Sequence, residues 1–247
     1  MARVLIPLPD RDFDVTEVAV PWRLLTRAGH DVVFCTERGD VTPEADPRLL
    51  TGVLFGQLGA EEEALRFHAE MVRSPGWDSP LSWRGLDVSP YDALLLPGGH
   101  APGMRQYLGS AELQARVAAF WALERPVAAI CHGVLVLART RTEDGRSVLH
   151  GHRTTCLPGY LERTAFWATA WRLGRYYRTY PAYVEQEVRA ALAAPEDFVR
   201  GPLELGRRGT DHDDRHAFVV EDGRYVSARW PGDAYLFAKA LIARLPD

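Results

Sequence analysis

A cysteine and a histidine stand next to each other at Cys131 and His132, directly after the short apolar run 126–130. Such a run is typical of a buried strand, and the Ala/Leu-rich segment that follows it predicts a helix. Cys131 is therefore expected on a sharp strand-to-helix turn. Small residues at Ala129 and Gly133 would let a nucleophile project above the sheet. The free N–H groups at the start of the helix would favour a thiolate there.

A buried core cysteine is the alternative interpretation, since free cysteines are among the most buried residues in proteins. A cysteine nucleophile also needs a base and hydrogen-bond donors for a developing oxyanion. His132 is the nearest candidate base, although adjacency alone suits a structural histidine equally well. The sequence around the turn is therefore needed to decide between a nucleophile and a buried core cysteine.

Strands and helices are expected to alternate around Cys131. Buried strands are predicted at 3–7, 31–35, 91–96 and 126–130, and helices at 18–25, 61–72 and 111–123. This succession predicts an α/β fold, with a doubly wound, mostly parallel sheet that carries helices on both faces. Ligands of such sheets bind beyond the carboxyl ends of the strands, where Glu17, the Gly98–Gly99 pair and Cys131 would meet.

Other parts of the chain add smaller elements. The sequence predicts a helix cap at Asp14 or Thr16, a long decorated connection at 37–92, a short strand at 153–157, a hairpin at 217–227 and a closing helix at 233–245. No repeat or linker marks a second domain. Residues 1–247 are therefore expected to form a single domain, with a mainly helical lid or cap insertion at about 160–208.

Composition argues against several classes of function. The formal net charge is -4 and the arginines are scattered, which disfavours a nucleic-acid partner. No apolar stretch reaches membrane-spanning length and the first residues do not resemble a signal peptide, so a cytoplasmic location and no membrane partner are expected. The widely spaced Cys35, Cys131 and Cys156 suit reduced thiols better than disulfides.

Several motifs resemble the ThiJ/PfpI superfamily and occur in the same order along nearly the whole chain. They are Glu17-x-x-x-Pro21, Pro97-Gly98-Gly99-His100, Ala129-Ile130-Cys131-His132-Gly133 and Ser227-Ala228-Arg229-Trp230-Pro231-Gly232. The long segment between Cys156 and Asp211 is similar to the larger heat-shock chaperone and glyoxalase III-like branch. The resemblance implies a flavodoxin-like, class I glutamine amidotransferase-like sandwich and a homodimer.

The resemblance also implies a role for each candidate residue. Cys131 would be the nucleophile, and Glu17 would carry a proton beside its sulfur, because two negative charges in contact are unfavourable. Without the resemblance, Glu17 would be an ordinary first-turn carboxylate stabilised by the helix dipole. Glu162 would orient His132 and raise its basicity. The alternative for Glu162 is a solvated helix glutamate beside Arg163.

The resemblance also implies which groups bind the oxyanion and the substrate. Backbone N–H groups of Gly99 and His132 would form the oxyanion hole, and Gly98 and His100 would contact the substrate. Two histidine pairs in turn regions, His150 with His152 and His212 with His216, could be drawn as metal sites with Asp211. Histidine and aspartate in turns are usually solvated, so neither a metal nor any other cofactor is expected.

Three functions are consistent with these residues. The leading one is a cysteine-dependent enzyme of small reactive carbonyls, which converts a 2-oxoaldehyde to a 2-hydroxy acid in a glyoxalase III-like reaction, or performs a related deglycase reaction. The second is a cysteine hydrolase, peptidase or amidase, although no glutamate closely follows His212 or His216, as glutamine hydrolysis would require. The third is a stress chaperone or redox sensor in which Cys131 is oxidised beside Glu17.

Overall fold

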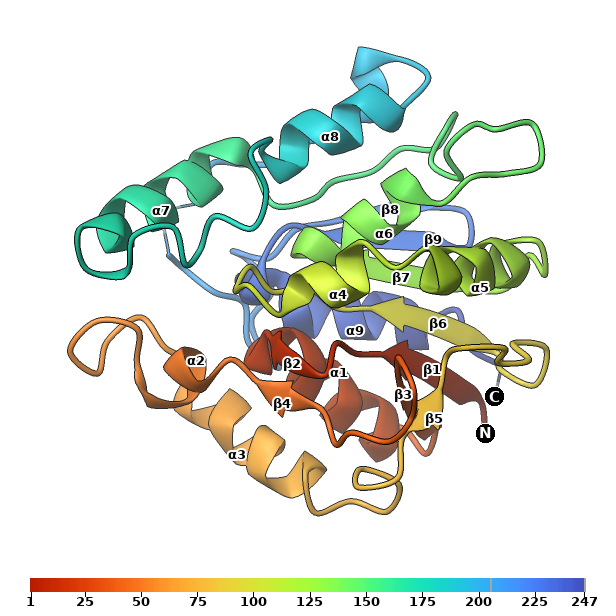
Figure 1. Cartoon of the computed structure of the whole chain (residues 1–247), viewed down its shortest axis with the longest axis horizontal. Helices are drawn as coiled ribbons and strands as arrows, with labels where there is room; N and C mark the ends of the chain where they lie inside the picture. Colours follow the sequence, from red (N-terminus) through yellow and green to blue (C-terminus); the bar gives the residue numbers. More distant parts are fainter. Residues whose placement is uncertain (205, 247) are drawn as a thin grey trace.

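The computed structural model describes residues 1–204 and 206–246, and a seven-stranded sheet lies at its centre (Figure 1). Its strands are β1 (Arg3–Pro7), β3 (Asp31–Thr36), β5 (Leu81–Ser82), β6 (Ala93–Leu96), β7 (Val127–Ile130), β8 (Val219–Asp222) and β9 (Tyr225–Ala228). They are ordered β5-β3-β1-β6-β7-β9-β8, and every neighbouring pair is parallel except the β8–β9 hairpin. The predicted α/β fold with a mostly parallel sheet is confirmed.

Helices cover both faces of this sheet, which explains why its central strands are continuous apolar runs. One face carries α1 (Val15–Arg27) and α9 (Ala234–Ile242), with α3 (Glu62–Met71) packed against α1; the other carries α4 (Met104–Leu108), α5 (Ala111–Trp121) and α6 (Val134–Arg139) (Figure 1). Every residue of β6 and β7 is buried between these layers. The carboxyl ends of both strands are thereby fixed for the site.

The first helix shows how the sequence positions Glu17. Asp14 is the N-cap, and its side chain accepts hydrogen bonds from the backbone N–H groups of Thr16 at 2.8 Å and Glu17 at 3.1 Å. The capping prediction is confirmed for Asp14. Pro21 lies inside α1 beyond its first turn, so it cannot supply the N–H that would bond to the carbonyl of Glu17.

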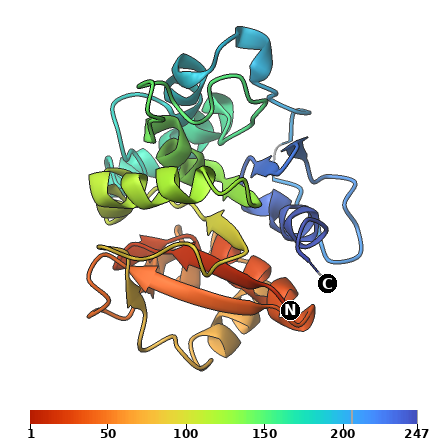
Figure 2. The same ribbon diagram turned by 90° about the vertical axis from the view of Figure 1, so that its right-hand side faces the viewer.

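A helical insertion covers one end of the sheet. It contains α7 (Gly159–Leu173) and α8 (Val184–Ala191), and α8 packs on α6. In Figure 2 these two helices form a further layer outside α5 and α6. The short α2 (Pro47–Thr51) and the loop after it approach α7 at the same end (Figure 1). Among the described residues, no helix is long and apolar enough to cross a membrane.

The strand predicted at 153–157 is wrong. The described chain forms only an isolated bridge there, between Thr154 and Phe198. The adjacent N–H of Thr155 donates instead to the hydroxyl of Ser227 at 3.0 Å, so this backbone group is satisfied without a strand ladder. The connection at 37–92 also contains elements that were not predicted: α2, β5 and β4 (Glu44–Ala45). β4 pairs with β2 (Arg11–Phe13) in a small second sheet.

Candidate active site

Cys131 lies on the predicted turn between β7 and α6. It begins a single 3-10 turn, Cys131–Gly133, with a φ of +58°. A positive φ is uncommon for any residue with a side chain and marks a strained turn. Only glycine fits at Gly133, because a Cβ there would lie 2.2 Å from the carbonyl oxygen of Leu96. The sharp turn is therefore possible because Gly133 has no side chain at the point where β6 lies closest to the turn.

The thiol of Cys131 lies beside the imidazole of His132. The Sγ atom is 3.5 Å from Nδ1, and both side chains are buried. Burial lowers the pKa of His132 well below 6.5, and the neighbouring His100 lowers it further. The ring of His100 stacks on that of His132 at 5.7 Å, and burial lowers its own pKa to about 4. Both imidazoles are neutral at pH 7, so His132 can accept a proton from the thiol.

Glu17 is held as a buried acid next to this pair. Its Oε2 accepts a hydrogen bond from the backbone N–H of Gly98 at 2.8 Å, and its Oε1 has no hydrogen-bond partner within the described chain. Burial, followed by the negative charge of Asp14, raises the pKa of Glu17 well above its ordinary value, and the side chain of Cys131 opposes this rise. The raised pKa favours the protonated form of Glu17, and Oε1 is the oxygen free to carry the proton.

Burial favours the thiol form of Cys131 over the thiolate. Burial raises the pKa of the thiol well above its usual value, and the carboxyl groups of Glu17 and Asp14 add to this effect. The backbone N–H of His132 opposes it only in part. The helix dipole was expected to favour a thiolate, but α6 has six residues and follows a 3-10 turn, so its dipole is weak compared with the cost of burying a charge.

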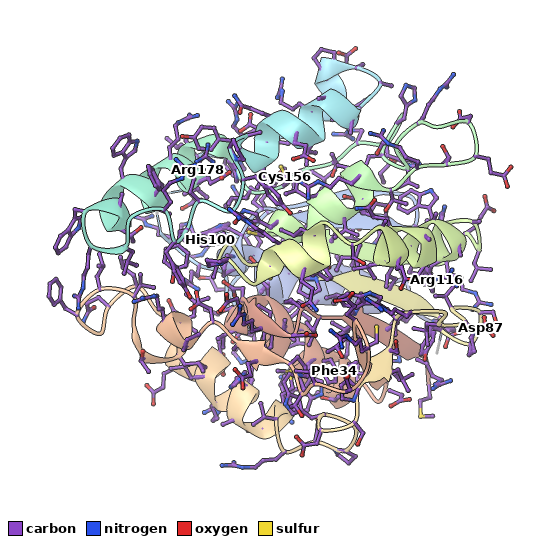
Figure 3. The ribbon with its side chains drawn as sticks, viewed as in Figure 1. Phe34, Asp87, His100, Arg116, Cys156 and Arg178 are labelled. Atoms are coloured by element: carbon purple, nitrogen blue, oxygen red, sulfur yellow. The ribbon has the colours of Figure 1, made fainter. Side chains whose placement is uncertain are left out.

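In the part of the chain that the structure describes, Glu162 forms hydrogen bonds with Arg178 and Val184, and not with His132 as predicted. Its Oε1 accepts a hydrogen bond from Arg178 Nη1 at 2.7 Å, and its Oε2 accepts one from the backbone N–H of Val184 at 2.9 Å. Figure 3 shows Arg178 below α7 and α8, on the side of the core that carries His100. Both carboxylate oxygens are occupied, and within the described residues no hydrogen bond joins Glu162 to His132. Arg178 acts on His132 only through its charge, which helps to lower the pKa of that imidazole.

The Gly98–His100 segment has mixed roles. Gly98 donates its N–H to Glu17, and its carbonyl oxygen accepts the N–H of Asp14 at 3.0 Å. These backbone groups therefore hold Glu17 and Asp14 in position, and the substrate contact expected for Gly98 stays a prediction. His100 lines the cavity at Cys131, as a substrate-binding residue would. The oxyanion donors predicted at Gly99 and His132 stay predictions.

A cavity of about 360 Å³ has Cys131 in its wall. Most of its lining is aliphatic and comes from α7 and from the segment around α2. The lining residues are Asp14, Thr16, Leu49, Val53, Leu58, Gly59, Ala60, His100, Cys131, Leu157, Leu161, Glu162, Thr164, Ala165, Ala168, Thr169, Tyr177, Gly206, Arg208, Trp230 and Pro231. A concave apolar site with a few polar groups is the usual form of a small-molecule site.

The sequence did not identify several polar residues of this cavity. Asp14 was recognised only as a helix cap, and burial raises its pKa to about 6. Tyr177 packs on the ring of His100 at 4.3 Å and donates its hydroxyl to Asp46 at 3.0 Å. Arg208 reaches the cavity from a segment with no regular pattern. Only the position of Asp14, one helical turn before Glu17, carried a signal that could have revealed it.

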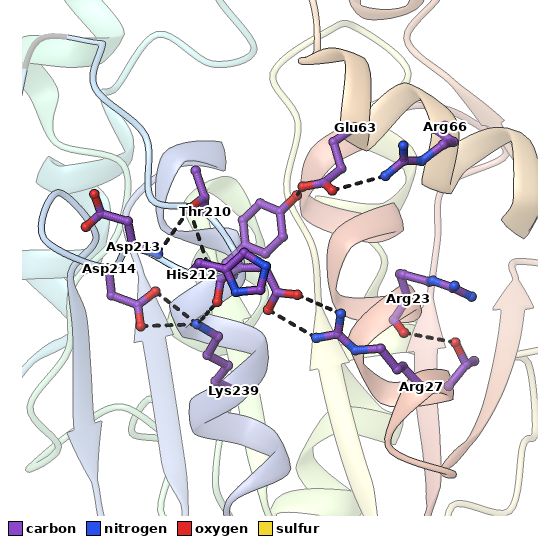
Figure 4. Close-up of polar contacts among 12 residues, drawn as sticks. Arg23, Arg27, Glu63, Arg66, Thr210, His212, Asp213, Asp214 and Lys239 are labelled. Carbon is purple, nitrogen blue, oxygen red and sulfur yellow. Dashed lines mark hydrogen bonds and ion pairs between the residues drawn. The ribbon is translucent and has the colours of Figure 1, made fainter.

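Asp211, the acidic residue considered for metal binding, and two other acidic residues near the candidate histidines are paired with basic side chains. Arg27 Nη1 lies 2.6 Å from a carboxylate oxygen of Asp211. Figure 4 shows Lys239 beside the carboxylate of Asp214, and the two groups are 3.2 Å apart. His152 Nδ1 lies 2.8 Å from a carboxylate oxygen of Asp222. Within residues 1–204 and 206–246, no group of three His, Cys, Asp or Glu side chains is placed to hold a metal ion.

Several known proteins are similar to this chain in sequence. An uncharacterised protein of Schizosaccharomyces pombe is 28% identical over 249 residues, which cover 97% of this chain and 82% of that protein. A deglycase of Pyrococcus abyssi is 25% identical over 245 residues, covering 98% of this chain and 99% of its own length.

Solved structures show the same fold. The crystal structure of glyoxalase III from Candida albicans superposes with a TM-score of 0.69, covering 99% of this chain and 98% of that one. Its sequence is 19% identical, so this likeness concerns the fold alone. Residues 8–202 match the family described as ThiJ/PfpI family-like, which is well over half of the sequence. The chain therefore belongs to the ThiJ/PfpI-like family.

Proposed function

We propose that the protein is a cysteine-dependent enzyme that converts a 2-oxoaldehyde to a 2-hydroxy acid. The observation that carries this proposal is the Cys131 thiol in a cavity wall, with Sγ 3.5 Å from the neutral imidazole of His132. The names of two similar proteins, a deglycase and a glyoxalase III, support chemistry on reactive carbonyl compounds.

The first step is addition of the thiol to the aldehyde. His132 Nδ1 accepts the proton of Cys131 while Sγ attacks the aldehyde carbon, C1, and a new C–S bond forms. His132 passes this proton on to the aldehyde oxygen, which becomes a hydroxyl group, so the product is a hemithioacetal and His132 is neutral again. The N–H groups of Gly99 and His132 are the proposed donors to this oxygen.

The second step moves hydrogen from C1 to C2. A base removes the proton on C1 to give an enediol, and C2 is then protonated. C1 is thereby oxidised to a thioester and C2 reduced to an alcohol, so no external oxidant or reductant is needed. His132 suits the role of base because it is neutral, and protonated Glu17 can donate a hydrogen bond from its otherwise unpaired Oε1.

The third step releases the product. Water attacks the thioester, the C–S bond breaks, and the 2-hydroxy acid leaves while Cys131 recovers its proton. The net reaction adds one water molecule to the 2-oxoaldehyde. With methylglyoxal as the substrate, the product is lactate.

The test is lactate formation from methylglyoxal by the wild type and by Cys131→Ala. The variant is expected to be slower by about 1,000-fold or more, because the nucleophile is lost. Cys35→Ala is the matched control, since Cys35 is buried in β3 and does not line the cavity. Equal rates for Cys131→Ala and the wild type would refute the proposal.

One surface feature favours chaperone activity as a second candidate function. Trp167 and Trp171 on α7 are largely exposed, as is Phe55 on the facing loop. Exposed aromatic side chains in one region are typical of surfaces that bind other apolar groups. Suppression of client-protein aggregation that survives in Cys131→Ala but is lost in Trp167→Ser with Trp171→Ser would support this function.

A further inference from the structure

The cavity at Cys131 is larger than a small carbonyl compound requires. Its volume of about 360 Å³ lies in the range of sites for drug-sized ligands. Methylglyoxal carries only a methyl group beside its two carbonyls, so it would leave most of this space unfilled. The residues that line the remaining space therefore indicate which substituent the natural substrate carries.

One face of α7 gives the cavity an aliphatic surface, and Glu162, Thr164 and Thr169 of the same helix also line the cavity. Leu161, Ala165 and Ala168 recur at intervals of four and three residues, which places them on one face of the helix, and all three line the cavity. Leu49 and Val53 line it from the segment around α2. These side chains offer no hydrogen bonds, so a hydroxylated sugar chain placed against them would lose its hydration without compensation.

The apolar lining continues to the mouth of the cavity. Leu58 lines the cavity and is largely exposed. Nearby, Phe55 stacks on Trp171 with the ring centroids 6.3 Å apart, although their exposed fractions are 76% and 69%. This pair joins α7 to the loop after α2, the two segments that face each other at one end of the molecule in Figure 1.

Charged lining residues lie near the nucleophile. Asp14 is close enough to Cys131 to affect its ionisation, and Arg208 is close enough to affect that of Asp14. The cavity therefore has charged groups near Cys131, and its remaining lining is mainly apolar, with Thr164 and Thr169 among the aliphatic side chains. A matching ligand has polar oxygens at one end and an apolar body.

We infer that the preferred substrate is a 2-oxoaldehyde with a bulky apolar substituent, such as an aryl or branched alkyl group. Its two carbonyls would lie at Cys131 and its substituent against the Leu161, Ala165 and Ala168 face of α7. This inference rests on the proposed function, because it concerns the same reaction at the same site. With phenylglyoxal, addition of one water gives mandelate.

The experiment compares kcat/KM of the wild type for phenylglyoxal, methylglyoxal and 3-deoxyglucosone, a 2-oxoaldehyde with a hydroxylated chain. Phenylglyoxal is expected to exceed methylglyoxal by about tenfold or more, as extra apolar contacts in a hydrophobic pocket provide. The hydroxylated compound is expected to be no better than methylglyoxal. A wild type that uses methylglyoxal or 3-deoxyglucosone best would overturn this inference and leave the proposed function standing. No turnover of any of the three compounds would overturn both.

Variants of α7 test where the substituent binds. Ala165→Phe should lower kcat/KM for phenylglyoxal by about tenfold while changing that for methylglyoxal by less than about twofold. Ala170→Phe is the matched control, because Ala170 lies on the same helix but does not line the cavity. Ala168→Phe repeats the test at an exposed lining position, where folding is not at risk. Equal losses for both substrates in Ala168→Phe would place the substituent elsewhere and refute the inference.

Discussion

Glu162 of α7 and Arg178 of the segment between α7 and α8 form a buried ion pair. Glu162 Oε1 lies 2.7 Å from Arg178 Nη1, and the two side chains are only 3% and 8% exposed. The guanidinium also donates to the carbonyl oxygen of Pro181 at 2.7 Å, and its carbon lies 3.6 Å from the ring centre of Tyr183. The pair therefore fixes the chain between α7 and α8, the part of the molecule that roofs the cavity.

Glu162→Gln tests whether this residue stabilises the insertion or orients His132. The amide NH₂ would face a donor on either side, Arg178 or the N–H of Val184, so one buried donor loses its partner. Breaking a buried pair in this way costs about 3 kcal/mol of unfolding free energy. Urea unfolding should show this loss, while kcat of the folded enzyme changes little. A large fall in kcat with unchanged stability would instead indicate that Glu162 acts on His132.

Asp14→Asn should make the protein more stable at neutral pH. Burial raises the pKa of Asp14 from 3.8 to about 6, so in the interval between these values the folded chain retains a proton that the unfolded chain has released. Stability contributed by this group therefore falls as pH rises through that interval, by about 2 to 3 kcal/mol in total. Asparagine has no such proton and is an equally good helix cap.

Urea unfolding of Asp14→Asn and the wild type from pH 4 to pH 8 checks this linkage. The free energy of unfolding of the variant, relative to that of the wild type, should increase between about pH 4 and pH 6. Above that range the difference should stay constant. Glu17→Gln is a useful companion, since the pKa of Glu17 is raised for the same first cause, burial. A variant at position 14 that is less stable than the wild type at pH 7.5 would show that the ionised carboxylate is needed there.

The sequence predicted the sheet and the nucleophile turn because both are local patterns. The predicted strand 3–7 has the observed bounds of β1, and the run ending at Ile130 is β7. Cys131, Glu17 and the glycine pair meet because each stands at the end of an element of one parallel sheet. Short elements such as β5, which has two residues, give no periodic signal and were missed.

The partner of Glu162 could not be predicted in the same way. Arg178 comes from an irregular segment between two helices, and nothing in its composition distinguishes it from the many other arginines of the chain. Its position depends on how the insertion folds back over α6. The apolar face of α7 was equally obscure, because alanines at 165 and 168 gain a meaning only when the cavity between α7 and α2 is known.

Gly133→Ala is expected to destabilise the protein strongly. A Cβ at this position would lie 2.2 Å from the carbonyl oxygen of Leu96 and 2.6 Å from that of Pro97, so β6 or the turn must move. The expected loss in unfolding free energy is about 3 kcal/mol or more, as in other overpacked cores.

Gly159→Ala is the matched control for this substitution. Its new Cβ would meet nothing closer than Arg163 Nη1, at 3.4 Å, which is an ordinary contact. Its stability should change by less than about 1 kcal/mol. Similar stabilities of the two variants in guanidinium chloride would mean that the turn at Cys131 is more adaptable than the close approach of β6 indicates.

The last prediction concerns the reactivity of Cys131 in the absence of substrate. Burial and the carboxyl groups of Glu17 and Asp14 raise the pKa of this thiol, and only the thiolate is an effective nucleophile toward simple electrophiles. In a Cys35→Ser, Cys156→Ser background, where Cys131 is the sole thiol of the sequence, iodoacetamide should therefore alkylate it at pH 7 at least about tenfold more slowly than free cysteine.

The pH dependence of the alkylation rate of Cys131 provides a second test. The rate should still be rising at pH 9, because the thiolate fraction grows until the pH passes the raised pKa. A resting thiol of this kind requires His132 to remove its proton when the aldehyde is in place, so slow alkylation combined with fast turnover fits the proposed enzyme. Rapid alkylation at pH 7, or selective oxidation of Cys131 by dilute peroxide, would mean that the thiolate is already present and would favour the redox sensor instead.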